Sequence, residues 1–150
     1  MLGVAVRRSG VWTYGILNLF HILGVSTLFG SILILDLRLL GWLRRGTIAE
    51  LALVTIPLAR IGFIVAAMAG ITMLSTNGPD YVGNPFLLIK FPAILAGLLN
   101  AAVISRLPAW RACGHRELSA HERRQLAVMG GISLVCWTTA LSAGRMIGYW

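Results

Sequence analysis

The chain has 150 residues, of which 57% are hydrophobic and only 12% are charged, and its mean hydropathy is +0.81. A soluble domain carries about 25% charged residues, so this composition excludes an ordinary soluble enzyme and indicates a membrane protein in a lipid bilayer. The net charge of +8 would suit a nucleic-acid partner in a soluble protein. Here the cations fall mainly between apolar runs, where they set membrane topology, and we expect no nucleic-acid partner.

Four apolar runs follow one another along the chain, and each is long enough to cross about 30 Å of hydrocarbon as a helix. We predict spans at residues 14–35, 51–75, 85–105 and 126–149. Before the last run, Ser119 and Glu122 have the spacing of a helix cap. The predicted fold is an all-α, single-domain, polytopic four-helix bundle over residues 1–150, multi-pass in the bacterial inner membrane.

The connections between the runs differ in charge, and this difference predicts their orientation. Eight of the 13 Lys and Arg residues lie in the connections after the first and third runs, and three lie on the opposite side of the bundle. The positive-inside rule places the eight in the cytoplasm. Both termini and residues 76–84 are then expected on the outer, periplasmic side.

Several ionisable or metal-ligating side chains fall within the predicted spans, where each needs a partner or a function. His21 lies about 10 Å below the outer edge of the first span and Lys90 about 7 Å below that of the third. Arg145 is near the outer end of the last span, and Met68 in the second matches the depth of His21. These residues form a candidate cofactor site near the outer surface.

The chemistry of this set fits haem b. His21 would be an axial metal ligand, Met68 could be a second, and Lys90 or Arg145 could meet the propionates. Since His21 is the one histidine within a span, it would pair with Met68, have an open position opposite, or pair across a homodimer. The alternative is structural: the two cations reach to the headgroups, and His21 hydrogen-bonds to a neighbouring helix.

An inner pair is also expected. Asp36 ends the first span, and Arg60 lies about 13 Å into the second. An ion pair between them would reduce the cost of burying Arg60, so we predict a structural Asp36–Arg60 pair. In the polar connections and the last run, His115, His121, Cys113 and Cys136 show no metal-site spacing and are interpreted as solvated histidines and unpaired thiols.

Three stretches, residues 21–41 (HILGVSTLFGSILILDLRLLG), 84–101 and 133–150, resemble a family of small, uncharacterised four-helix bacterial membrane proteins with no established function. More loosely, the first helix is similar to CopD-type copper-resistance proteins and to HemJ-type protoporphyrinogen oxidases. The HemJ resemblance, carried by His21, Arg38-Leu39 and Lys90, implies haem b or porphyrin chemistry. Longer HemJ motifs are absent, so porphyrinogen oxidation itself is not expected.

The sequence thus predicts a membrane subunit that binds haem b for electron transfer or haem handling, with His21 as the metal ligand. One alternative is a non-catalytic anchor or assembly subunit of a larger complex. Another is CopD-like copper handling, although copper favours several soft or imidazole ligands. The expected partners are membrane or periplasmic protein subunits, a second copy of the chain, or a quinone.

Overall fold

A computed structural model describes residues 11–77 and 82–149, and this part of the chain is entirely helical apart from its connections. The long helices are α2 (Val11–Leu39), α3 (Ile48–Asn77), α4 (Pro85–Ile104) and α6 (Ala120–Met146). A short helix α5 (Pro108–Ala112) precedes α6, and the 3-10 turn η2 (Ile147–Tyr149) follows it. The predicted all-α fold is confirmed.

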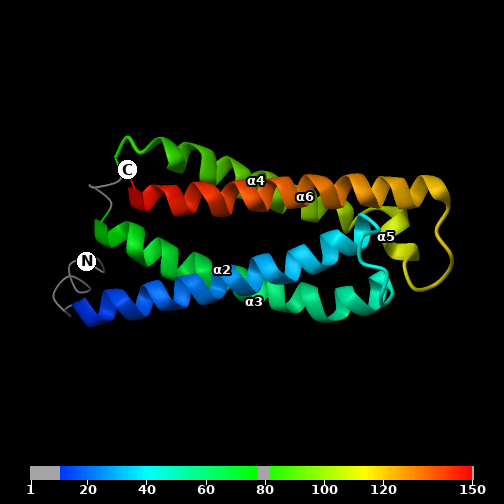
Figure 1. Cartoon of the computed structure of the whole chain (residues 1–150), viewed down its shortest axis with the longest axis horizontal. Coiled ribbons are helices and arrows are strands. Elements are labelled where there is room, and N and C mark those ends of the chain that lie inside the picture. Colours follow the sequence, from blue (N-terminus) through cyan, green and yellow to red (C-terminus); the bar gives the residue numbers. More distant parts are fainter. Residues whose placement is uncertain (1–10, 78–81, 150) are drawn as a thin grey trace.

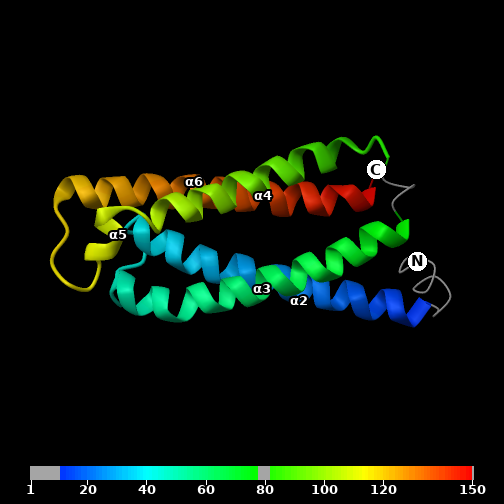
Figure 2. The ribbon, with the colours of Figure 1, turned by 180° about the vertical axis from the view of Figure 1, so that it is seen from behind.

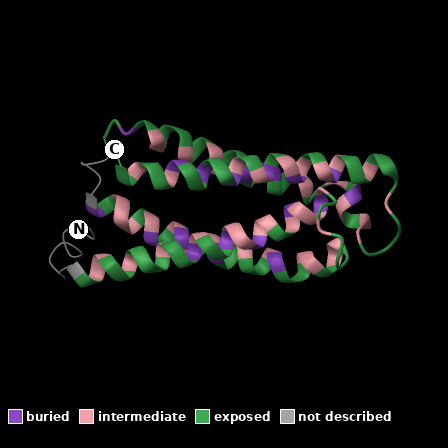
Figure 3. Cartoon of the chain, in the orientation of Figure 1, coloured by how far each residue is buried: buried purple, intermediate pink, exposed green. Residues whose placement is uncertain are grey.

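Four of these helices are long and apolar enough to cross a membrane, so the chain is a multi-pass membrane protein. Two of the helices extend beyond the predicted apolar runs at both ends: α2 has 29 residues and α3 has 30, or about 45 Å at the usual rise. Large apolar side chains such as Leu53, Leu88 and Val135 are exposed on their outer faces. Figure 3 shows buried residues where helices meet and exposed residues on the outward faces, as a lipid environment favours.

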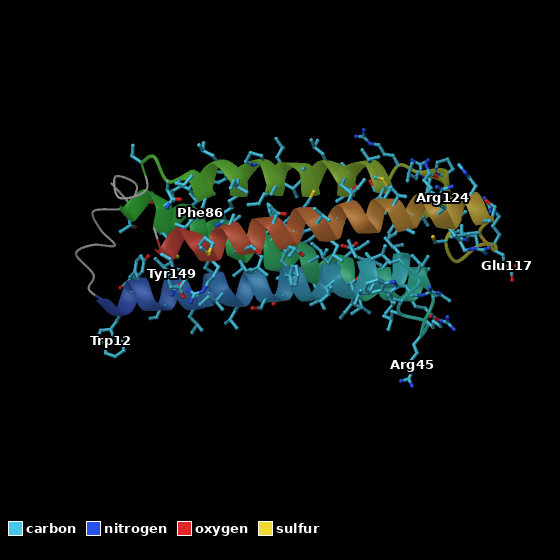
Figure 4. The ribbon with its side chains drawn as sticks, turned by 45° about the horizontal axis from the view of Figure 1, so that its top comes forward. Trp12, Arg45, Phe86, Glu117, Arg124 and Tyr149 are labelled. Atoms are coloured by element: carbon cyan, nitrogen blue, oxygen red, sulfur yellow. The ribbon has the colours of Figure 1, made fainter. Side chains whose placement is uncertain are left out.

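The helices pack as two pairs, α2 with α3 and α4 with α6, and α2 also contacts α6. Figures 1 and 2 show α2 crossing α3, so that α2 approaches the α4–α6 pair at the end where α5 lies and diverges from that pair toward the opposite end. In Figure 4, Trp12, Phe86 and Tyr149 lie at this opposite end, whereas Arg45, Glu117 and Arg124 lie at the α5 end. We call these the distal end and the α5 end.

Glycines bring α2 and α3 into backbone contact. A Cβ atom added to Gly24 would lie 2.6 Å from the Ala66 amide nitrogen, and one added to Gly62 would lie 2.6 Å from the Leu28 nitrogen. Only residues without a side chain allow this approach. The crossing fixes which face of α2 points toward α3.

Trp137 on α6 joins the two pairs near the middle of the bundle. Its indole lies over Gly97 of α4, where an added Cβ would come within 2.9 Å of a ring atom. Its ring also meets Phe63 of α3 edge to face, with centroids 6.3 Å apart. Trp137 is 7% exposed, so this large apolar side chain fills the space between the pairs.

At the α5 end, the start of α6 is set by local hydrogen bonds. Ser119 and Glu122 form the reciprocal cap that the sequence predicts, and Arg116 pairs with Glu122. The helix therefore begins at Ala120, six residues before the expected apolar span. Beneath this cap, Leu39, Ala109 and Leu126 form the buried cluster that closes the bundle.

Candidate functional site

His21 is held by a contact between α2 and α3. Its Nδ1 lies 2.8 Å from the Ala66 carbonyl oxygen. A carbonyl oxygen can only accept, so Nδ1 carries the proton and the lone pair of the neutral ring lies on Nε2. Gly70 makes room for the ring, because a Cβ there would be 3.0 Å from His21 Cε1.

Lys90 approaches the same region from the other helix pair. Its side chain runs from α4 along Gly144 of α6, where an added Cβ would lie 3.4 Å from Nζ. The ammonium is close enough to His21 for the two to interact electrostatically. Both side chains are half-buried. The structure therefore brings His21 and Lys90 together from the two pairs, in the half of the bundle toward the distal end.

Arg145 lies at the edge of this region rather than within it. Its guanidinium donates a 2.6 Å hydrogen bond to the Tyr149 hydroxyl and sits 4.8 Å from the centre of that ring. Both side chains are exposed. Arg145 is thus a residue of the distal rim, with a partner one turn away.

Met68 does not face His21. It is 67% exposed, and it lies two residues after Ala66, whose carbonyl binds the histidine. Two residues correspond to about 200° around a helix, so Met68 points away from the α2–α3 contact. The expected match in depth does not make it a ligand opposite His21.

Asp36 and Arg60 are likewise not joined. The described residues contain one ion pair, Arg116–Glu122, and Arg60 is exposed. Gly62 faces α2, so Arg60, two residues earlier, projects from the opposite side of α3. Asp36 instead faces α6, where Gly130 approaches its backbone and the Ser133 hydroxyl lies near its carboxyl group.

The two ionisable regions lie at different levels of the bundle. Fifteen residues separate His21 from Asp36 along α2, which is about 22 Å. Trp137 lies between them, one turn from Ser133 on α6 and seven residues before Gly144. The aromatic contact of Trp137 therefore divides a distal region, with His21 and Lys90, from an inner one with Asp36.

The remaining reactive side chains do not cluster. Within the described ranges, no group of three or more His, Cys, Asp and Glu residues is arranged to hold a metal ion. Cys113 and Cys136 are both free, as expected. Burial, reinforced by the nearby charge of Glu122, raises the pKa of the Cys113 thiol, which donates to the Ala109 carbonyl oxygen. Hollows of the surface are lined by residues 83–91 and 121–128, and neither includes His21.

Sequence reasoning missed the residues that hold the candidate site in place. Ala66 supplies a backbone oxygen, which no side-chain pattern reveals. Gly62, Ala66 and Gly70 do recur every four residues, and this spacing of small residues could have identified the face of α3 that receives His21. Ser133, the partner of Asp36, has no comparable signal.

The family model of DUF6644, a family of unknown function, matches residues 3–150. Comparison with the curated proteins and with the solved structures gave no match. The match agrees with the expected resemblance to an uncharacterised family and covers nearly the whole chain. The looser likenesses to CopD-type and HemJ-type proteins gain no support from these comparisons.

Proposed function

Since the chain belongs to the DUF6644 family, whose function is unknown, we propose its function from the geometry around His21. The protein is an integral subunit of the bacterial inner membrane that binds haem b, for electron transfer or haem handling. His21 would hold the haem iron through Nε2, and Lys90 would meet a propionate.

The observation that carries this proposal is the hydrogen bond from His21 Nδ1 to the Ala66 carbonyl. Metal-binding histidines commonly donate their second ring nitrogen to a carbonyl or carboxylate, which orients the ring and selects the tautomer. Here that bond leaves the Nε2 lone pair for a metal. The same geometry is expected of a haem-ligating histidine.

The position of Lys90 supports an anionic ligand. A half-buried ammonium within a membrane protein is costly without a negative partner, and the described residues show no ion pair at Lys90. A propionate approaching between the helix pairs would supply that partner. Arg145 at the distal rim could meet the second propionate after releasing Tyr149.

With Met68 facing outward, His21 of this chain would hold the iron alone or together with His21 of a second copy. A single histidine ligand would suit haem transfer or small-ligand chemistry, and a pair of histidines would suit electron transfer. Electrons would be exchanged with a partner membrane or periplasmic subunit or with a quinone.

The test is the absorption spectrum of the detergent-purified protein, expressed with ample haem, together with metal analysis. The wild type should show a Soret band and bind iron. His21→Ala should lose both while keeping its helical circular dichroism, and His121→Ala, at an exposed position in the first turn of α6, is the matched control that should keep them. Met68→Leu should leave the spectrum unchanged. A colourless wild type without iron would overturn the haem proposal, and copper in place of iron would favour the CopD-like alternative.

The same hydrogen bond favours one other function, a non-catalytic anchor or assembly subunit. In that case His21 only links α2 to α3, and its Nε2 binds nothing. His21→Ala would then lower the stability of the detergent-solubilised protein, while neither wild type nor variant would hold a metal.

A further inference from the structure

Asp36 is an unusual residue for its position. Among the described residues it is the one acidic or basic residue that is buried, with 4% of its surface exposed. It lies three residues before the end of α2, on the face that packs against α6. There Gly130 lets the helices approach, since an added Cβ would come 3.4 Å from the Asp36 carbonyl oxygen.

The groups around the carboxyl are neutral. The Ser133 hydroxyl lies where it can hydrogen-bond to one carboxyl oxygen of Asp36, whereas the other oxygen, Oδ2, is buried without a hydrogen-bond partner. On α4, the amide of the buried Asn100 donates to the Met129 carbonyl oxygen, one turn before Ser133. Asp36 therefore lies in a small polar layer inside an apolar bundle.

The charged side chains of the neighbouring elements are directed elsewhere. On α2 itself, Arg38 donates to the Gly46 carbonyl oxygen, and on α3 Arg60 is exposed. On α6, Glu122 pairs with Arg116. The one cation of α4, Lys90, lies against Gly144, eleven residues and about 16 Å beyond Ser133. No cation of the described residues thus balances a charge on Asp36.

An unpaired carboxylate in such a setting is strongly disfavoured, so the group needs a bound cation. A metal cation would require about six oxygen ligands, and the carboxyl and the Ser133 hydroxyl provide too few. A proton requires no ligand other than the carboxyl group itself. The hydroxyl can donate to the carboxylate or accept from the acid, so it serves both forms.

We propose that Asp36 is a reversible proton-binding site of the folded bundle, with Ser133 as its hydrogen-bond partner in both protonation states. The site lies where α2 meets α6, which is the most extensive contact between the two helix pairs. Release of the proton leaves a charge in that contact. Protonation of Asp36 therefore strengthens the joint between the pairs.

Infrared spectroscopy of the purified protein tests this proposal, because the chain has only five acidic residues. At neutral pH the wild type should show the carbonyl band of one protonated carboxylic acid, which shifts in D2O. The band should weaken as the pH is raised and return when it is lowered. Asp36→Asn should remove the band and still fold, since an amide has nearly the shape of the neutral acid.

Two variants provide controls. Glu50→Gln should keep the band, because Glu50 caps its own helix by accepting from the Thr47 amide. Ser133→Ala should keep it at a shifted frequency. If Asp36→Asn fails to fold, substitution of the other four acidic residues in turn should leave the band in every variant, which assigns it to Asp36 by elimination.

The proposal is overturned by a wild type with no acid band at neutral pH, or by a band that survives Asp36→Asn. It is also overturned by a band that does not respond to pH until the protein unfolds, since such a proton would be permanent. Stabilisation by sodium that disappears in Asp36→Asn would assign the site to a metal cation instead.

Discussion

Replacement of Gly24 by alanine should separate α2 from α3. The new Cβ would lie 2.6 Å from the Ala66 nitrogen, 2.9 Å from the Gly62 carbonyl oxygen and 3.0 Å from the Ala66 Cα. All three are backbone atoms, so no side-chain rotation relieves the clash. Restoring an ordinary contact of 3.4 Å moves the helices apart by about 0.8 Å at the crossing. Overpacking of this kind costs about 1–3 kcal/mol of unfolding free energy.

Gly30 on the same helix is the matched control. Nothing lies within 4 Å of a Cβ added there, and alanine favours a helix over glycine by about 1 kcal/mol. Gly30→Ala should therefore be neutral or stabilising. The two variants make the same chemical change in the same helix, so the gain in helix propensity cancels, and their unfolding free energies should differ by the overpacking cost of about 1–3 kcal/mol.

The measurement is reversible unfolding of the detergent-solubilised protein, followed by helical circular dichroism. If haem is bound, Gly24→Ala should also weaken its binding, because His21 lies one turn from Gly24 and depends on Ala66 across the same crossing. Equal unfolding free energies for Gly24→Ala and Gly30→Ala would refute the argument that the backbones touch at this point.

Two further predictions concern the ends of the bundle. Reporter fusions after Arg45 and after Arg116 should report a cytoplasmic location, because both arginine-rich connections lie at the α5 end. A fusion within residues 77–83 should report an external location. The inverted pattern would reverse the proposed orientation of the His21 region. In a Cys136→Ser background, alkylation of Cys113 should be slow at neutral pH and should accelerate only above the pH range in which an ordinary thiol ionises. The reason is that burial and the charge of Glu122 raise the pKa of Cys113, and the thiolate is the reactive form. An alkylation rate at neutral pH equal to that of the denatured protein would contradict this.

The sequence by itself determined the number of membrane helices and their order. Hydropathy is a sum over consecutive residues, and a span must satisfy its own backbone hydrogen bonds, so each helix could be predicted without knowledge of its neighbours. The cap of α6 was predictable for the same reason, since Ser119 and Glu122 contact each other within one turn. Depth along a helix also follows from the rise per residue, which is why His21 and Lys90 could be predicted at one level.

Only the tertiary structure decided which side chains face one another at a given level. The direction in which a side chain projects depends on the rotation of its helix about the helix axis, and a step of two residues changes that direction by about 200°. Thus Met68 points outward although Ala66 holds His21, and Arg60 points outward although Gly62 touches α2. Asp36 consequently meets Ser133 rather than Arg60. These rotations are set by where glycine lets two backbones touch, and that contact exists only once the helices have packed.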